Sequence, residues 1–318
     1  MKTISKFFIA FFLLTLFSCD DIMEKDITND MVITVSPSEG QEIYSNVVNF
    51  RWNELKGANS YRLQVYSEGA VVMDSLVKTN NFTQTLQPGD YQWRVRGENF
   101  AYQTAYTFPK GFKLIETDDL TNQQVLLLNP LADAYSNTSV LSFNWTELSA
   151  ATSYEFQIIN TATGGSIVQE NDLSTNSYSV TSGIISQDGQ YSWKVKAKNS
   201  DNDTQTGYST RSFYIDTTPP NAPQNSSPST DATVSLRNEV NFQWSGGTDT
   251  GVVNSAVTYT LQIATDTGFT NVIQTVNTAN LSYGYTFSVA GTYYWRVRSK
   301  DQANNSGAYS TYSKLTVQ

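Results

Sequence analysis

The sequence predicts an all-β protein built of three tandem β-sandwich domains. A set of tryptophan-containing motifs occurs three times, and the first tryptophan of the set recurs after 93 and then 99 residues, at Trp52, Trp145 and Trp244. That spacing is the length of one sandwich domain. The motifs alternate large apolar and polar side chains, as strands with one buried face do. Residues 19–318 show no sustained apolar period of 3.6, which argues against long helices.

Three strand motifs make up each repeat. The first is Phe-x-Trp, the second is Tyr-x-Leu/Phe-Gln-Val/Ile, and the third is Tyr-x-Trp-Lys/Arg-Val-Lys/Arg. They occupy residues 50–52, 143–145 and 242–244, then 61–65, 154–158 and 259–263, then 91–96, 191–196 and 293–298. In the first repeat Val48, Phe50 and Trp52 share one face. Such inward sets fill the space of roughly 10 Å between two stacked sheets.

The last motif and the turn after it resemble those of fibronectin type III domains. The segments Tyr191–Asn199 and Arg298–Ser306 follow that family's Tyr-x-x-x-Val-x-Ala pattern and its polar turn before the last strand. The second tryptophan of each repeat departs from the animal domains, and Leu86 precedes Tyr91 by five residues rather than six. The resemblance covers residues 32–318 and implies immunoglobulin-like sandwiches, while saying little about function.

The repeats predict the domain boundaries. The three sandwiches are expected at residues 32–115, 125–215 and 224–318. The linker 116–124 is acidic and polar. The linker 216–223 contains three prolines and is expected to be extended and fairly stiff.

The first eighteen residues have the features of a secretory signal. Lys2 and Lys6 precede an apolar run over residues 7–17. At 1.5 Å per residue, that run is too short to cross a hydrocarbon core of about 30 Å. A short apolar run after positive charge and before a small residue is typical of a cleaved signal peptide.

The residues at the end of the signal resemble the lipobox of bacterial lipoproteins. Leu16-Phe17-Ser18-Cys19 has the small residue before cysteine that this motif requires, although Phe17 is looser than the usual pattern. The resemblance implies that Cys19 is lipidated and becomes the first residue of the mature chain. Residues 19–31 are then a tether, and the protein is bound to the membrane through its lipid. An ordinary signal peptide with a stray cysteine is the alternative.

Acidic residues follow the cysteine at Asp20, Asp21 and Glu24. In some Gram-negative groups such residues direct a lipoprotein to the cell surface, whereas in enteric bacteria Asp beside the cysteine retains it at the inner membrane. We expect an outer-membrane lipoprotein that faces outward.

Composition argues against several classes of function. The net charge of −9 and the lack of any Lys/Arg block disfavour nucleic acid as a partner. The sequence contains no histidine, which removes the commonest general base and metal ligand. The single cysteine forms no intrachain disulfide. We therefore predict no catalytic residues, no cofactor and no metal, and a protein that is not an enzyme.

Phe100 and Tyr102 are the predicted ligand contacts. They follow Gly97-Glu98-Asn99 on the turn before the last strand of the first repeat, where this fold displays recognition loops. Packing against the second sandwich or capping of the core is the alternative. The tryptophans are expected in the core rather than as platforms for sugar rings.

Two other sets of polar residues have competing interpretations. The Tyr-x-Trp strand carries outward basic residues in every repeat, at positions 94, 96, 194, 196, 296 and 298, and outward glutamines are expected opposite them, at positions 64, 157 and 262. A solvated cross-strand ladder is favoured over a stripe for anionic glycans. Residues 201–203 and Asp249 offer oxygen ligands for calcium, but turn chemistry is favoured because neither matches an EF-hand loop.

The function predicted from these features is binding or adhesion at the cell surface, with a glycan or a protein as ligand. The alternative is a spacer or scaffold lipoprotein of an outer-membrane nutrient-uptake complex. An enzyme would need a rigid carboxylate pair, and the adjacent Asp118 and Asp119 lie in a linker.

Lipidation gives the first testable prediction. Replacing Cys19 by Ser should leave the protein without acyl chains and release it from membranes, because the thiol is the attachment point. Mass spectrometry and membrane fractionation measure this. A variant that stays in the membrane fraction with its acyl chains would contradict the assignment.

Overall fold

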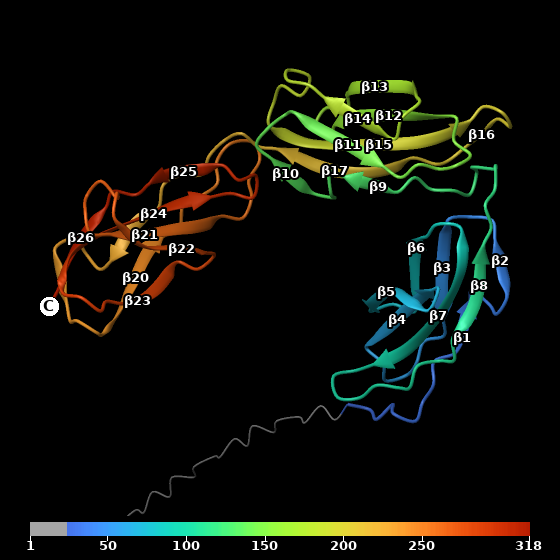
Figure 1. The fold of residues 1–318 in the computed structure, drawn as a ribbon, viewed down its shortest axis with the longest axis horizontal. Coiled ribbons are helices and arrows are strands. Elements are labelled where there is room, and N and C mark those ends of the chain that lie inside the picture. Colours follow the sequence, from blue (N-terminus) through green and yellow to red (C-terminus); the bar gives the residue numbers. More distant parts are fainter. Residues whose placement is uncertain (1–23) are drawn as a thin grey trace, which may run out of the picture. The chain divides into compact units, whose positions relative to one another are not determined.

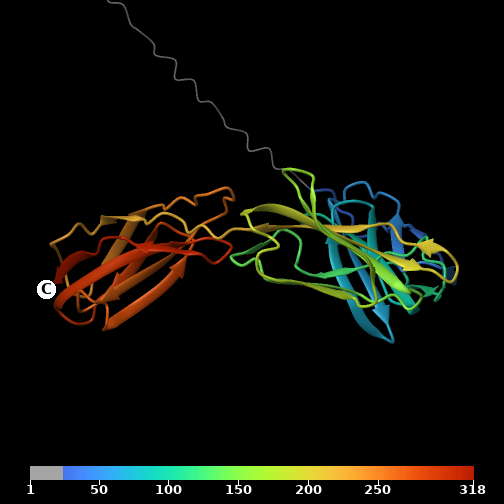
Figure 2. The same cartoon turned by 90° about the horizontal axis from the view of Figure 1, so that it is seen from above.

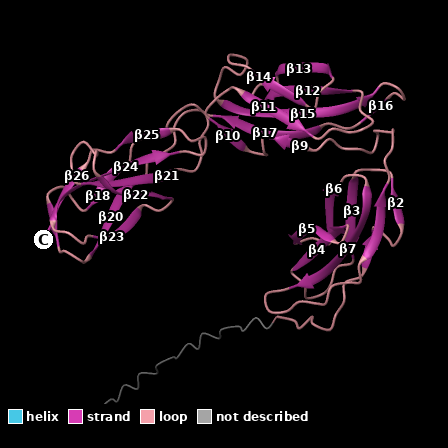
Figure 3. Cartoon of the chain, viewed as in Figure 1, coloured by secondary structure: helices cyan, strands magenta, loops and turns pink. Residues whose placement is uncertain are grey.

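The computed structural model describes residues 24–318, and these residues form strands and loops without a helix (Figure 3). The chain divides into two compact units. The first holds the described residues up to Ile43 together with Val48–Ile115, and the second holds Tyr44–Val47 and Glu116–Gln318. No helix in the described part of the chain is long and apolar enough to cross a membrane.

The first sandwich contains eight strands in two sheets. A three-stranded sheet has the order β1-β3-β6, and a five-stranded sheet has the order β2-β8-β7-β4-β5. The strands are β1 (Thr34–Ser36), β2 (Gln41–Ile43), β3 (Val47–Trp52), β4 (Ser60–Ser67), β5 (Ala70–Val77), β6 (Asn81–Thr85), β7 (Gly89–Glu98) and β8 (Lys110–Leu114).

The second sandwich repeats this arrangement. Its sheets have the orders β14-β11-β9 and β10-β17-β15-β12-β13, with β16 paired to β15. The strands are β9 (Leu127–Asn129), β10 (Ala134–Ser136), β11 (Leu141–Trp145), β12 (Ser153–Asn160), β13 (Ser166–Leu173), β14 (Ser177–Val180), β15 (Gly189–Asn199), β16 (Thr204–Gln205) and β17 (Ser209–Ile215).

The third sandwich has the same order again, and Figures 1 and 2 show it, in orange and red, as layered strands. Its sheets are β18-β20-β23 and β19-β26-β24-β21-β22, with β25 paired to β24. The strands are β18 (Gln224–Ser227), β19 (Ala232–Val234), β20 (Glu239–Ser245), β21 (Thr258–Ala264), β22 (Val272–Thr278), β23 (Ser282–Thr286), β24 (Gly291–Lys300), β25 (Ser306–Tyr309) and β26 (Ser313–Val317).

The predicted fold class is therefore confirmed: the protein is all-β and consists of immunoglobulin-like sandwiches. The strands lie at 34–114, 127–215 and 224–317, inside the spans expected from the repeats. The precise domain boundaries stay predictions.

The tryptophans form the cores, as predicted. All six indoles are at most 3% exposed. In the second sandwich Phe143 meets Trp193 edge to face with ring centroids 5.2 Å apart, and Trp145 stacks on Phe156 at 5.7 Å. Aromatic pairs at these separations stabilise a core beyond the area that they bury. The indoles are thus unavailable as platforms for sugar rings.

A tyrosine at the start of the long strand closes each sandwich. The hydroxyls of Tyr91, Tyr191 and Tyr293 donate to the carbonyl oxygens four residues upstream, at 2.9, 2.8 and 2.9 Å. This is the tyrosine corner of immunoglobulin-like domains. Tyr191 and Tyr293 are buried, whereas Tyr91 is only half-buried and packs against the edge of its core. The third motif therefore supplies both the core residues of the long strand and the tyrosine that holds the turn before it.

The burial of Trp145 gives a prediction of stability. Trp145→Ala should lower the free energy of unfolding of the second sandwich by about 3–5 kcal/mol, because it removes a buried aromatic and leaves a cavity. Hydrogen–deuterium exchange across residues 127–215 measures the loss of protection. Leu131→Ala, at a position 65% exposed, is the control and should change little. Unchanged protection in Trp145→Ala would contradict the core assignment.

Candidate functional site

The loop after β7 displays the predicted contact residues. Glu98 at the end of β7 forms an isolated bridge with Gln103, and the amide of Asn99 donates to the carbonyl of Tyr102 at 2.9 Å. Between these bonds the chain turns back on itself. Phe100 is 94% exposed at the tip and Tyr102 is 39% exposed. Phe100 therefore does not cap the core, which was one of the two alternatives for this residue.

Asn99 holds the loop in this shape. Its side-chain oxygen accepts hydrogen bonds from the amides of Ala101 and Tyr102, at 3.1 and 2.7 Å. Its side-chain nitrogen donates to the carbonyls of Lys25 and Gly57, both at 2.8 Å. One amide thus makes four bonds that join the loop to two other segments of the same unit. The exposure of Phe100 is imposed by a fixed backbone, an arrangement that sequence reasoning did not identify.

The corresponding loops of the other sandwiches carry no aromatic residue. In the second, Asn199 donates to the carbonyl of Asp118 at 3.1 Å, and Asn202 donates to the same oxygen at 2.9 Å. In the third, the loop runs from Asp301 to Asn305. The same framework thus supports three different loop tips, and only that of the first sandwich presents a large apolar side chain.

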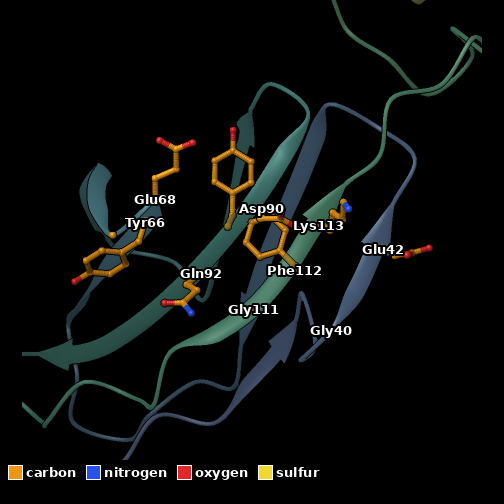
Figure 4. A pocket seen from close by; sticks show the side chains of 11 residues that line it. Gly40, Glu42, Tyr66, Glu68, Asp90, Gln92, Gly111, Phe112 and Lys113 are labelled. Carbon is orange, nitrogen blue, oxygen red and sulfur yellow. The ribbon is translucent and has the colours of Figure 1, made fainter.

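A second candidate surface is a hollow of about 650 Å³ on the five-stranded sheet of the first sandwich. Figure 4 shows its lining side chains along β4, β7, β8 and β2. The residues are Gly40, Glu42, Tyr66, Glu68, Gly69, Asp90, Tyr91, Gln92, Gly111, Phe112 and Lys113.

Strand register explains the composition of this hollow. Lys113 on β8 pairs with Asp90 on one side and with Glu42 on the other. In the next row Gln92 stands between Tyr66 and Gly111. Gly111 has no side chain, and the carboxylate of Glu39 lies against it and accepts a hydrogen bond from its amide at 2.8 Å. Three carboxylates and one ammonium line the hollow, so it favours neutral or cationic groups over anionic ones.

The predicted cross-strand ladder is present in the first sandwich. Arg94 donates to the side-chain oxygen of Gln64 through Nε at 3.0 Å and through Nη2 at 2.7 Å. Its guanidinium also lies over the rings of Tyr66 and Tyr106, 5.1 and 4.3 Å from their centroids. Two aromatic rings and one glutamine thus contact this half-buried charge, as expected of the cross-strand ladder.

The third sandwich repeats this arrangement with different aromatics. Arg296 donates to the side-chain oxygen of Gln262 at 3.0 and 2.8 Å. Phe269 and Tyr309 cover its guanidinium, each with the centroid 3.9 Å away. Sequence reasoning identified the glutamine partners but missed the aromatic covers, which lie outside the repeated motifs.

In the second sandwich the outward basic side chains of the long strand are arranged around a buried carboxylate. Gln157 lies opposite Lys194 in register, as predicted, but it donates to Glu155 at 2.8 Å. Glu155 also pairs with Lys196 at 3.0 Å and accepts a hydrogen bond from the Tyr208 hydroxyl. Burial alone would raise the pKa of Glu155, yet the Tyr208 hydrogen bond and the Lys196 charge outweigh it and lower that pKa to about 2.

The loop 201–203, considered for calcium, has the geometry of a turn. Its three side chains are exposed, Asp203 has a left-handed φ of 56°, and the side-chain oxygen of Asn202 accepts bonds from the amide and hydroxyl of Thr204. Asp118, considered above as part of a carboxylate pair, accepts hydrogen bonds from Asn199 and Asn202 through its backbone carbonyl oxygen. Cys19 lies outside the described residues.

Comparisons with known proteins bear on the fold. No family model matches the sequence, and no curated protein matches it. Among solved structures the chain is similar to the FN1–FN3 domains of chicken CNTN1, with 14% identity over 90% of this chain and 97% of that one and a TM-score of 0.45. It is also similar to the fibronectin(III)-like modules of Clostridium thermocellum CbhA, with 15% identity over 58% and 94% and a TM-score of 0.23. The fold assignment therefore rests on the order of the strands in the sheets and on the packing of the cores described above.

The lowered pKa of Glu155 predicts a pH-dependent contribution to stability. Ionised Glu155 stabilises the second sandwich above pH 4.5, its ordinary pKa, and the contribution is lost as the pH falls from there towards 2. Glu155→Gln should therefore unfold at a lower temperature than wild type at pH 7, and the difference should shrink in acid.

Thermal unfolding between pH 2 and pH 7 measures this. Glu147→Gln removes an exposed carboxylate of the same sandwich and should follow the wild-type curve. A difference between Glu155→Gln and wild type that is constant with pH would contradict the role assigned to the charge.

Proposed function

We propose that this protein is a lipid-anchored, outward-facing surface protein that binds a glycan or a protein through the loop 99–103 of its first sandwich. The single observation that carries the binding proposal is the display of Phe100 on a loop fixed by Asn99. Attachment through Cys19 and location in the outer membrane are part of the same proposal and rest on the sequence.

The geometry of the loop supports a role in recognition. A large apolar side chain at 94% exposure contributes little to folding, but its surface is available for burial in a partner. Because Asn99 already fixes the backbone, binding does not have to order the loop, and that entropy cost is avoided. Aromatic anchors of this kind dominate the binding energy of many interfaces.

Composition and fold support a function other than catalysis. Fibronectin-like sandwiches typically serve in binding or as spacers and carry no active site. The absence of histidine from the sequence removes the usual general base. Glu155, whose pKa is lowered, is engaged by Lys196 and Tyr208 and stabilises a sheet face of the second sandwich.

The alternative function is a spacer or scaffold in an outer-membrane complex. The observation that favours it is the burial of Pro220 and Pro223 in the linker 216–223, which makes that linker part of a packed surface. Deleting the third sandwich while keeping membrane display distinguishes the two. A spacer loses its phenotype when shortened, whereas a binding protein that uses the first sandwich keeps it.

Phe100 gives the decisive test of binding. With ligands first identified on a glycan array or by pull-down against surface proteins, Phe100→Ala should weaken binding at least tenfold, or about 1.4 kcal/mol. Phe108→Ala is the matched control, because Phe108 is 84% exposed on the same sandwich; it should leave affinity unchanged. Equal affinities for wild type and Phe100→Ala, or no ligand in either screen, would contradict the proposal.

A further inference from the structure

Three carboxylates from distant segments meet beside the third sandwich. Asp216 is the first residue after β17, Asp249 lies in the loop between β20 and β21, and Asp301 follows β24. One oxygen of each lies within 4.8 Å of the other two. Within residues 24–318 no other group of three acidic side chains comes together in this way. Like charges at this separation repel one another, so the arrangement needs an explanation.

Two of the carboxylates are already oriented by donors. Asp249 accepts from the Thr250 amide at 2.9 Å, and from the amide and hydroxyl of Ser255 at 2.6 and 2.9 Å. Asp301 accepts from the amide of Asn305 at 2.8 Å and from its side-chain nitrogen at 2.8 Å. These bonds hold each carboxylate in one orientation. Across residues 24–318, none of the three aspartates forms an ion pair with Lys or Arg.

Asp216 differs from the other two because one of its oxygens has no donor. Its side chain is completely buried, at 0% exposure. Oδ1 accepts from the amide of Thr218 at 3.1 Å, but Oδ2 has no hydrogen-bond partner in the described structure. Burial and the charges of Asp249 and Asp301 raise the pKa of Asp216 to about 6. A buried carboxylate that lies beside two others and keeps one oxygen without a donor is the arrangement expected of a cation ligand.

Packing on the third sandwich holds the linker so that Asp216 lies beside the carboxylates of Asp249 and Asp301. A Cβ on Gly307 would lie 2.2 Å from the Pro220 carbonyl oxygen, and a Cβ on Gly247 would lie 2.4 Å from that of Asn221. Two glycines of the third sandwich thus make room for the linker backbone. Asn305 also donates to the Asp216 carbonyl at 2.7 Å. The positions of the three carboxylates are therefore set by packing on several sides.

The chemistry of the ligands selects the ion. All three are carboxylate oxygens, which suit hard cations such as Ca²⁺ rather than zinc or copper. A Ca–O bond is about 2.3–2.6 Å, so two oxygens on one calcium ion lie at most about 5 Å apart, and the three oxygens meet this limit. Ligands from three separate loops also fit the irregular coordination of calcium better than the strict octahedron of magnesium.

We propose that Asp216, Asp249 and Asp301 bind one calcium ion, which fixes the start of the proline-rich linker onto the third sandwich. The site is independent of the loop 99–103 and does not rest on the proposed binding function. Of the residues considered for calcium from the sequence, Asp249 belongs to it and residues 201–203 do not.

Calcium titration tests the proposal. The full chain, purified in detergent and freed of metal with EGTA, should bind one equivalent of Ca²⁺ by calorimetry, with Kd at or below about 1 mM, the weak limit for extracellular sites. Calcium should also raise the temperature of unfolding. Asp216→Asn should weaken binding at least tenfold and abolish this shift. Asp203→Asn, an exposed aspartate in the equivalent loop of the second sandwich, should bind as wild type does.

Folding of the variant is checked without calcium. Asp216→Asn removes repulsion, so in EGTA it should unfold at or above the wild-type temperature. If it does not fold, Asp249→Asn at the half-buried ligand replaces it in the same titration. The proposal is overturned by the absence of Ca²⁺ binding up to about 10 mM, by an Asn variant that binds as wild type does, by an equal loss in Asp203→Asn, or by Mg²⁺ binding of equal strength.

Discussion

The rest of the structure depends on the packing of two indoles per repeat between two sheets. Trp52 and Trp93 lie with centroids 6.4 Å apart in the first sandwich, and Trp145 and Trp193 lie 6.5 Å apart in the second. With no disulfide available, each domain is held by apolar burial, and these rings and the phenylalanines beside them are among its largest fully buried side chains. Since every second residue of the core strands points inward, outward positions and loops are the places left for chemistry.

Much of the fold was predictable because its signals are local. Alternation along Phe50-x-Trp52 and Tyr91-x-Trp93 identifies which face of each strand is buried, and hairpin register then follows from the turns. For the same reason the pairs Gln64–Arg94 and Gln262–Arg296 were predictable: both partners are outward residues of neighbouring antiparallel strands.

The sites were less predictable because they depend on contacts between distant loops. Phe100 was predicted as a contact from its place in the repeat, but two of the four bonds that Asn99 makes involve Lys25 and Gly57, far from it in sequence. The rings that lie against Arg94 and Arg296, such as those of Tyr106 and Phe269, belong to residues outside the repeated motifs. Asp216, Asp249 and Asp301 are separated by 33 and 52 residues, and none of them stands in a motif that marks a metal ligand.

In all three sandwiches the loop after the long strand contacts the segment that precedes its own sandwich. Asn99 bonds to Lys25, Asn199 to Asp118, and Asn305 to Asp216, each through a side-chain amide that donates to a backbone carbonyl. This shared contact anchors one side of the loop, so its remaining residues are free to diverge. In the first sandwich they present Phe100 to solvent, and in the third they bring Asp301 beside Asp216. One packing solution thus permits an exposed aromatic tip in one domain and a cluster of three carboxylates at the junction of another, because neither feature alters the indole core beneath it.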